Sequence, residues 1–333
     1  MVKRINPNIE ISVIVPCFNE EKTIQLLLQA ILDQNIQPEK IELIIADAMS
    51  TDLTRTKIQE FAIRNPKLSI RIVDNIKRTI PAAINAAALS AKGEFLIRLD
   101  AHSVPADDYI QNSIDLLRSG IAQNVGGIWE ICPSNESCIA KAISRAAAHP
   151  FGAGDAGYRI NAKSGFVDTV PFGAFKKADF IQLGGFDEDL LSNEDYEFNT
   201  RLRQKGGKVW LDTSIRSKYF ARKNLSELAK QYWRYGFWKY RMLRKHPKSL
   251  RWRQAIPPIF VLSLIILGIS SFFTPFARII FATGVGIYLL ALLSSSIIES
   301  VTKKDGCYLM MALAFATIHF CWGGGFLYSY FSK

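Results

Sequence analysis

The stretch ISVIVPCFNE at residues 11–20 decides the fold, because a short apolar, β-branched run leads directly into a polar turn that ends in an acid. A continuous apolar run of this length is typical of a strand buried on both faces. After it, Ile24, Leu27, Leu28 and Ile31 follow the spacing i, i+3, i+4, i+7. That spacing predicts a helix over residues 20–34 with one buried face.

The same alternation of strand and helix continues to about residue 100. Strands are predicted over residues 41–46, 69–73 and 94–99, with a second helix after Asp52. An alanine-rich third helix opens at Pro81, in the first turn where proline is tolerated, and we expect Gly93 to close it. Alternating elements of this kind predict an α/β fold with a mostly parallel sheet.

The residues that follow these strands are polar and acidic. Asn19 and Glu20 follow the first strand, Asp47 to Asp52 the second, and Asp100 to His102 the fourth. Ligands bind outside the carboxyl ends of such strands, although Glu20 and Asp52 would also suit helix capping. The first turn contains no glycine, and the chain contains no G-x-x-x-x-G-K-[ST] segment, so dinucleotide-binding and P-loop proteins are disfavoured.

The final third of the 333-residue chain has a different composition. Three runs contain almost no charge: Ala255–Phe273, Ile279–Ile298 and Tyr308–Tyr330. Each is close to the roughly 20 residues that a helix needs to cross a bilayer. We therefore predict a globular domain over residues 1–253 and a membrane domain with about three transmembrane helices over residues 254–333. Pro257, Pro258 and Pro275 leave re-entrant or interfacial helices as the alternative.

The net charge of +11 is concentrated where the membrane domain begins. Lysines and arginines crowd residues 239–253, and Lys303 and Lys304 lie between the second and third apolar runs. This placement favours membrane lipids over nucleic acid as partners. It predicts a multi-pass protein of the cytoplasmic (inner) membrane with its globular domain in the cytoplasm and its C-terminus outside. Glu10 interrupts the apolar N-terminal stretch, so no signal peptide is expected.

For the cysteines and the last apolar run, the sequence predicts structural features and no catalytic role. The five cysteines form no C-x-x-C pair and lie apart from the histidines, so neither a zinc cage nor a disulfide framework follows. The soluble part is expected to stay reduced in the cytoplasm. In the last run, His319 and the glycines at 323–325 are interpreted as helix packing with a flexible break.

Two further segments point to chemistry. Glu194 and Asp195 are adjacent, and Gln231, Arg234 and Tyr235 follow before the membrane runs. An adjacent acidic pair alone is usually a solvated helical turn. Together with a Gln-x-x-Arg-aromatic segment and a membrane anchor, in that order, the pair suggests sugar transfer at a membrane surface.

These motifs together resemble a known family. The motifs are Val-Pro-x-x-Asn-Glu at 15–20, Asp-x-x-Ser-x-Asp at 47–52, Asp-Ala-His at 100–102, Val-Pro-Phe-Gly-Ala-Phe at 170–175, Glu-Asp at 194–195 and Gln-x-x-Arg-aromatic at 231–235. They resemble the inverting family 2 glycosyltransferases of GT-A fold, within them the branch of the succinoglycan-synthesis glucosyltransferases. The resemblance implies a nucleotide-sugar donor, such as a UDP-hexose, and a lipid-linked oligosaccharide or glycan acceptor in exopolysaccharide synthesis.

The resemblance also implies a donor and metal site. Pro16, Glu20 and Arg78 would line the nucleoside slot, and Asp47 would contact the edge of uracil. The departing diphosphate carries negative charge, which a divalent cation stabilises. Asp100, which also approaches the ribose, and His102 lie two apart on a segment expected to be extended, so both can face one Mn²⁺ or Mg²⁺ ion.

Inversion requires a base, and the acidic pair supplies one. Asp195 is the candidate base, with Glu194 as its positioning partner. Arg234 would stabilise the departing diphosphate. The predicted acceptor contacts are Gly173, Gln231, Trp233 and Tyr235.

Two rival functions stay open at this point. A polyprenyl-phosphate glycosyltransferase would use a phosphate acceptor and depend less on Asp195 as a base. A catalytically silent nucleotide-binding membrane scaffold would be expected to have lost Asp100 or Asp195, and this chain keeps both. Many processive relatives have Trp where this chain has Tyr235, which favours addition of a single sugar.

Overall fold

The structure is a computed structural model that describes residues 9–332 except 155, 161–162 and 305. Its contacts divide the chain into two compact units. The α/β unit comprises Met1–Glu130 and Asn161–Tyr219, and the helical unit comprises Ile131–Ile160 and Phe220–Lys333. The predicted domain boundary at residue 253 lies at the start of the first long apolar helix, and it stays a prediction.

The α/β unit is built around the strand that opens the chain. β1 (Ile11–Cys17) pairs in parallel with β2 (Ile41–Asp47) and β4 (Phe95–Arg98), and β2 pairs in parallel with β3 (Ser69–Asp74). Side chains alternate between the two faces of a strand. Ile11, Val13 and Val15 therefore enter one core cluster, and Ile14 enters a second.

Later strands extend this parallel sheet on the far side of β4. β8 (Ala174–Lys176) pairs antiparallel with both β4 and β6 (Asn124–Cys132), and β9 (Val209–Phe220) pairs antiparallel with β5 (Val104–Pro105) and β7 (Gly165–Phe166). The order is β3-β2-β1-β4-β8-β6-β9-β5, with β7 on β9. The predicted α/β fold with a mostly parallel sheet is confirmed, and the added strands supply its antiparallel part.

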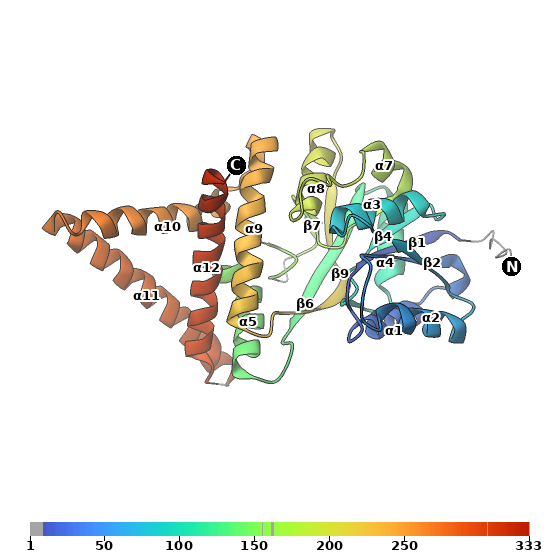
Figure 1. Ribbon diagram of the computed structural model, residues 1–333, viewed down its shortest axis with the longest axis horizontal. Helices are drawn as coiled ribbons and strands as arrows, with labels where there is room; N and C mark the ends of the chain where they lie inside the picture. Colours follow the sequence, from blue (N-terminus) through green and yellow to red (C-terminus); the bar gives the residue numbers. More distant parts are fainter. Residues whose placement is uncertain (1–8, 155, 161–162, 305, 333) are drawn as a thin grey trace. The chain divides into compact units, whose positions relative to one another are not determined.

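Helices cover both faces of the sheet (Figure 1). The first core cluster contains residues of α1 (Ile24–Leu32), α2 (Thr54–Arg64) and α4 (Tyr109–Ser119). The second contains residues of α3 (Ile80–Ser90), α7 (Lys177–Gln182) and α8 (Glu194–Gln204). A short 3₁₀ helix, η1 (Pro38–Lys40), precedes β2. The carboxyl ends of β1 to β4 are thereby left open between the two helical layers.

The predicted role of Gly93 is wrong. α3 ends at Ser90, with Ala91 as its C-cap, so Gly93 does not close the helix. A Cβ atom at Gly93 would lie 2.7 Å from the backbone of Ile11 and of Ser12, and its N–H donates to Ser12 Oγ at 2.9 Å. Glycine is needed there because the chain passes close to β1 as β4 begins.

The helical unit contains two sets of helices from distant parts of the sequence. α5 (Cys138–Ala148) and α6 (Pro150–Ala153) come from the middle of the chain. α9 (Leu225–Lys245), η2 (Pro247–Ser249), α10 (Trp252–Ser270), α11 (Pro275–Lys303) and α12 (Tyr308–Phe331) follow the α/β unit. Ile143 on α5, Leu228 on α9 and Phe315 on α12 share one buried cluster.

α9 and α12 lie side by side at very close range (Figure 1). A Cβ atom at Gly236 would lie 2.0 Å from the carbonyl oxygen of Trp322, and one at Gly325 would lie 2.2 Å from that of Trp233. The expectation of helix packing at residues 323–325 is confirmed. The expected flexible break is wrong, because α12 runs through these glycines without interruption.

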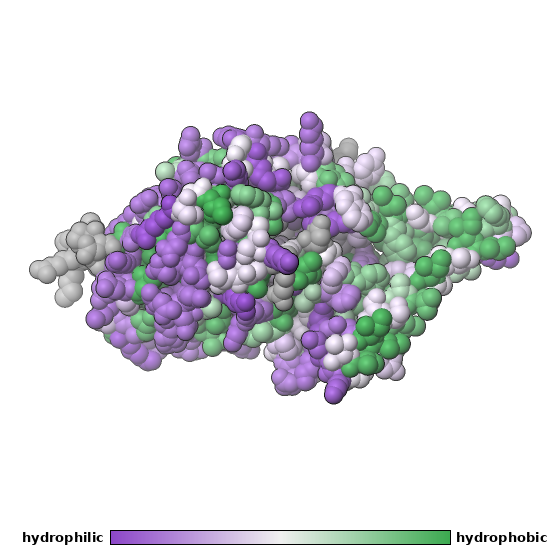
Figure 2. Space-filling view, turned by 180° about the vertical axis from the view of Figure 1, so that it is seen from behind, coloured by the Kyte–Doolittle hydropathy of each residue, from purple (hydrophilic) through white to green (hydrophobic). Residues whose placement is uncertain are grey.

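Within the described residues, α10, α11 and α12 are long and apolar enough to cross a membrane. Pro257 and Pro258 lie near the start of α10 and do not end it, and Pro275 occupies the first turn of α11. Most apolar side chains of α10 and α11 are exposed. Figure 2 shows hydrophobic side chains gathered over these helices and hydrophilic ones over the α/β unit. The predicted number of apolar helices is confirmed.

One cysteine pairing differs from the sequence-based expectation. Cys138 at the start of α5 and Cys307, the N-cap of α12, form a disulfide within the helical unit. Among the described residues, Cys17, Cys132 and Cys321 take part in no disulfide. The cysteine spacing predicted no disulfide framework, and it did not reveal this single pair because 169 residues separate its members and only the packing of α5 with α12 brings them together.

Candidate functional site

A cleft of about 160 Å³ opens at the carboxyl ends of the parallel strands. Five predicted site residues line it: Pro16, Glu20, Arg78, Asp100 and His102. The remaining lining residues are Cys17, Phe18, Ala48, Asn75, Thr79, Ile80 and Ala83. The cleft therefore combines an apolar surface with a few polar groups from the ends of β1, β3 and β4, which is the usual composition of a small-molecule site.

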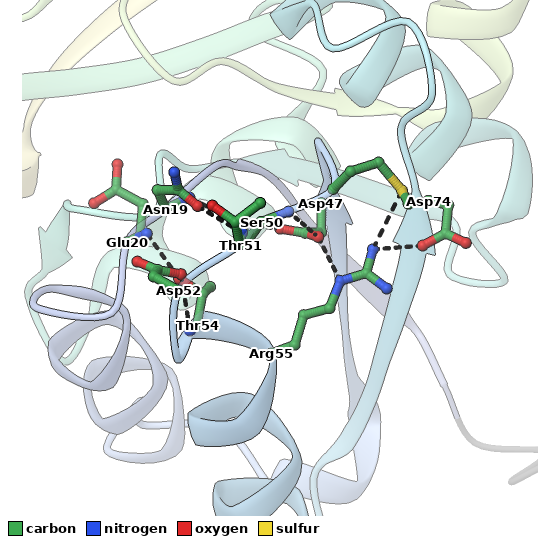
Figure 3. Close-up of polar contacts among 10 residues, drawn as sticks. Asn19, Glu20, Asp47, Ser50, Thr51, Asp52, Thr54, Arg55 and Asp74 are labelled. Atoms are coloured by element: carbon green, nitrogen blue, oxygen red, sulfur yellow. Dashed lines mark hydrogen bonds and ion pairs between the residues drawn. The ribbon is translucent and has the colours of Figure 1, made fainter.

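One side of the cleft is held by a network between the turns after β1 and β2 (Figure 3). Thr51 N–H donates to Asn19 Oδ1 at 2.9 Å, and Asn19 N–H donates to Ser50 Oγ at 2.8 Å. The Glu20 amide donates to Thr54 Oγ1 at 2.8 Å. We call residues 19–20, 47–55 and 74 the cleft wall.

Asp47 is the buried centre of the cleft wall. Its carboxylate accepts hydrogen bonds from the Ser50 amide at 3.0 Å, the Ser50 hydroxyl at 2.5 Å and Arg55 Nε at 2.5 Å (Figure 3). Arg55 Nη2 also reaches Asp74 at 2.5 Å. Asp47 is fully buried and is not among the residues lining the cleft. Its predicted contact with uracil stays a prediction.

The first helix begins later than predicted, and this places Glu20 in the cleft. The amides of Thr23 and Ile24 both donate to the Glu20 carbonyl, which forms a turn before α1 begins at Ile24. The Glu20 side chain accepts from Thr23 Oγ1, and its Oε1 lies 3.0 Å from His102 Nδ1. Glu20 therefore orients the imidazole of His102.

Asp100 and His102 follow β4 in a turn rather than in the extended segment expected from the sequence. The Ser103 amide donates to the Asp100 carbonyl at 3.0 Å, which closes this turn. Both side chains still line the same cleft. Asp100 Oδ1 is buried without a hydrogen-bond partner, a position that a cation would satisfy. Among the described residues, no group of three or more His, Cys, Asp or Glu side chains is arranged to hold a metal ion.

The acidic pair lies at the start of α8, directly after Asn193, which adopts the left-handed conformation at φ 64°. Glu194 is buried and Asp195 is partly buried. Burial raises the pKa of both carboxyls above the ordinary range, although the nearby Arg98 guanidinium opposes the rise. Carboxyls with raised pKa values are suited to accept a proton near neutral pH.

Arg98, at the end of β4, joins this pair to Asp100. Its Nη2 lies 3.0 Å from Glu194 Oε1 and 3.6 Å from Asp100 Oδ1. We call Arg98, Asp100, Glu194 and Asp195 the acid cluster. Sequence reasoning missed Arg98. Its position could have indicated a role, because it is a charged residue in an otherwise apolar strand, two positions before Asp100.

Gly173 has a structural role beside the acid cluster. A Cβ atom there would lie 2.4 Å from Asn124 Oδ1, so no larger residue fits without displacing that side chain. The Gly173 carbonyl accepts from the Arg98 amide at 3.1 Å. Its predicted acceptor contact is untested by this geometry.

The Gln-x-x-Arg-aromatic segment lies on α9 in the helical unit. Gln231 Nε2 donates to the Tyr235 hydroxyl at 2.9 Å, and Trp233 and Arg234 are exposed. The segment thus presents a guanidinium and an indole at the surface of its unit. Its predicted roles toward diphosphate and acceptor stay predictions.

Residues 12–184 match the family model for glycosyl transferase family 2, which spans β1 to α7 and includes the whole cleft. The chain belongs to the family 2 glycosyltransferases. This membership confirms the predicted family and the predicted sugar-transfer activity.

Two curated family 2 relatives extend the similarity over nearly the whole chain. A dolichyl N-acetyl-α-D-glucosaminyl phosphate 3-β-D-2,3-diacetamido-2,3-dideoxy-β-D-glucuronosyltransferase of Methanococcus voltae is 30% identical, with 93% of each chain covered. The succinoglycan biosynthesis protein ExoA of Rhizobium meliloti is 27% identical, with 94% of this chain and 93% of the relative covered.

A solved mannosyltransferase structure has a similar fold. The mannosyltransferase PcManGT of Pyrobaculum calidifontis, in complex with GDP-Man and Mn²⁺, has a TM-score of 0.63 and 18% identity. The comparison covers 93% of this glycosyltransferase and 86% of the mannosyltransferase. At this identity the similarity confirms the GT-A-like fold alone.

Proposed function

We propose that this glycosyltransferase moves a hexose from a UDP-sugar to a lipid-linked or glycan acceptor, with inversion at the anomeric carbon. One observation carries the proposal: Arg98 ties Glu194, the buried first member of the acidic pair at the start of α8, to Asp100 at the cleft. A donor-side carboxylate and a candidate base are thereby parts of one cluster. Support for the acceptor class comes from the relatives, whose names specify a dolichyl-phosphate-linked sugar and succinoglycan biosynthesis.

The cleft residues fit a divalent cation. Asp100 Oδ1 lacks a hydrogen-bond partner, and the His102 imidazole is oriented by Glu20. Asp100 and His102 would hold Mn²⁺ or Mg²⁺, with diphosphate oxygens and water as the remaining ligands. A bound cation would neutralise negative charge on the departing diphosphate. Pro16 and Arg78 line the same cleft and would contact the donor.

Asp195 would act as the general base. An acceptor hydroxyl attacks the anomeric carbon from the face opposite the nucleoside diphosphate, and its proton passes to Asp195. The new glycosidic bond forms as the bond to the diphosphate oxygen breaks, so the configuration inverts. A raised pKa makes this carboxylate a stronger base than an exposed aspartate.

The helical unit would supply the acceptor side and the membrane anchor. Arg234 would assist the diphosphate, and Gln231, Trp233 and Tyr235 would contact the acceptor. Three apolar helices and the basic residues before them favour an inner-membrane protein with its cleft in the cytoplasm, where nucleotide sugars are made.

The predicted topology can be tested with a reporter enzyme that is active only outside the cytoplasm. Fused to the C-terminus, this reporter should be active, and a silent reporter in a well-expressed fusion would contradict three crossings.

The decisive experiment uses the full chain in detergent. We would incubate it with UDP- and GDP-sugars, Mn²⁺ and a lipid extract, measure nucleotide release, and determine the anomeric configuration of the product. Selective, lipid-dependent UDP release with inversion is expected. Retention, or release from GDP-sugars alone, would overturn the proposal. Formation of a lipid-linked sugar monophosphate from polyprenyl phosphate would instead identify the rival phosphate-acceptor reaction.

A further inference from the structure

Arg98 occupies an unusual position for a charged side chain. It lies in β4 between apolar neighbours, and only 7% of its side chain is exposed. Its Nη2 faces Glu194, with 8% of the side chain exposed, and Asp100, with 23% exposed. The two carboxylates come from segments about 94 positions apart in the chain. Arg98 is the side chain that connects them.

Stability alone does not account for this arrangement. Nε and Nη1 of Arg98 are buried without hydrogen-bond partners. Each unsatisfied buried polar atom costs free energy, and a buried ion pair is often no more stabilising than an apolar replacement of the same volume. The ring of Phe186, 5.5 Å from the guanidinium carbon, offers only a weak additional attraction. A strand position that carries such a cost is expected where the charge serves the site.

The backbone around Arg98 holds the guanidinium at a fixed place. The Arg98 amide donates to the Gly173 carbonyl at 3.1 Å, and the Leu99 amide donates to the Ile14 carbonyl at 3.1 Å. β4 is thus clamped between β1 and the segment before β8. In contrast, α8 begins after the left-handed Asn193, a conformation that costs free energy for a non-glycine residue. The ion pair to Glu194 ties this strained helix start to the rigid strand.

We propose that Arg98 is a positioning residue that acts through Glu194 to hold Asp195 in register with the donor bound near Asp100. The inference rests on the proposed function, since Asp195 is the base only if sugar transfer is the reaction. It predicts that Arg98 affects turnover rather than donor binding. A displacement of about 1 Å at a reacting group can cost about 10²-fold in rate.

The test is Arg98→Lys, with donor KM, kcat and thermal stability measured in the full-length protein. Lysine keeps the charge, but its ammonium ends one covalent bond short of Nη2 and lacks the guanidinium fork. We expect kcat to fall by about 10²-fold while donor KM and Tm stay near wild type. A kcat close to wild type would overturn the inference, and so would a raised donor KM with unchanged kcat.

A matched control lies on the same sheet. Arg71 of β3 pairs with the buried Glu42 at 2.9 Å, and neither residue lines the cleft. Arg71→Lys makes the same chemical change to a comparable ion pair, and it should leave kcat unchanged. An equal loss of kcat in this variant would overturn the inference, because the effect would then be a general one.

A second variant keeps the test decisive if Arg98→Lys does not fold. Glu194→Gln leaves Arg98 in place and removes the charge through which it acts, so kcat should fall with donor KM unchanged. In the double variant the two losses should be less than multiplicative, whereas independent losses would contradict action through Glu194. Absence of transfer in the wild type would count against the proposed function, and an active wild type with fully active variants would count against Arg98 alone.

Discussion

The cleft wall and the acid cluster both contain charged residues and each contributes one acid to the cleft lining, Glu20 and Asp100, yet their hydrogen-bonding groups are paired to very different degrees. In the cleft wall, the Asp47 carboxylate accepts three hydrogen bonds, and Arg55 reaches two carboxylates. In the acid cluster, two nitrogens of Arg98 and one oxygen of Asp100 are buried without hydrogen-bond partners, and that oxygen lies 3.6 Å from Arg98 Nη2. The Asp47 carboxylate of the cleft wall has its hydrogen bonds without a ligand. The acid cluster has buried donor and acceptor atoms with which a ligand or cation would pair.

This difference separates two kinds of contribution. Satisfied buried networks stiffen a structure, and breaking them costs stability. A buried charged group with unpaired polar atoms costs stability, and such groups are retained where the chemistry of the site needs them. Changes in the acid cluster should therefore mainly reduce turnover, whereas changes at Asp47 and its ion-pair partners in the cleft wall should mainly reduce stability.

The largest effect is expected from Asp195→Asn. Removing a general base lowers the rate by about 10²–10⁴-fold, while UDP-sugar binding should stay near wild type because the cleft is intact. A turnover assay combined with calorimetric titration of the donor measures both. Asp187→Asn, in the loop before α8, is the control, and near-normal turnover in Asp195→Asn would refute the assignment.

The second-largest effect is expected when the divalent cation is removed or its binding is weakened. Chelation with EDTA should abolish transfer, and added Mn²⁺ should restore it. Glu20→Gln weakens the orientation of His102, so the Mn²⁺ concentration for half-maximal activity should rise by about 10–100-fold. His102→Ala should raise it at least as much, and His246→Ala in the helical unit should not. Full activity in excess EDTA would contradict a metal-dependent reaction.

A smaller, graded effect is expected from pH. Asp195 must be ionised to accept a proton, and its raised pKa means that protonation begins at a higher pH than for an exposed aspartate. As the pH falls through that pKa, kcat should drop about tenfold per unit. The acid limb of the pH–rate profile reports the ionisation of the Glu194–Asp195 pair as a whole. A pH–rate profile whose acid limb lies near the ordinary value of about 4 would contradict the raised pKa.

The smallest effect is expected in the cleft wall, and it should appear as stability. Asp47→Asn removes the buried partner of Arg55, so unfolding should become easier by about 1–3 kcal/mol. Asp74→Asn removes the exposed partner of the same arginine and should cost about 0–1 kcal/mol. Urea unfolding followed by tryptophan fluorescence compares the two. Calorimetry with UDP on Asp47→Asn tests the uracil contact, which unchanged affinity would contradict.

Local pattern was enough to predict the strands and the cleft residues they carry. The apolar runs at residues 11–15 and 41–46 became β1 and β2, because a buried parallel strand needs only a short apolar segment followed by a turn. Glu20, Asp100 and His102 then reached one cleft because parallel strands end at the same edge. The three apolar runs likewise became the long helices α10 to α12.

Contacts between segments that lie far apart in the chain could not be predicted from the sequence. Arg98 looked like an isolated charge, since its partner Glu194 lies far along the chain. Gly93 looked like a helix terminus, since the approach of β1 was unknown. α5 is a third case, since its packing partners α9 and α12 lie far along the chain. Each case depended on a neighbour that no local periodicity encodes.

The placement of α5 has a consequence for the order in which the protein is made. Its partner α12 is synthesised later, and 169 residues separate Cys138 from Cys307. At about 5–20 residues per second, α5 waits about 10–30 s for that partner. During this interval the face carrying Ala142, Ile143 and Ala146 has no α12 to bury it. Release from the ribosome before α12 is complete would therefore leave an apolar face on the middle of the chain, which chaperones and proteases would recognise.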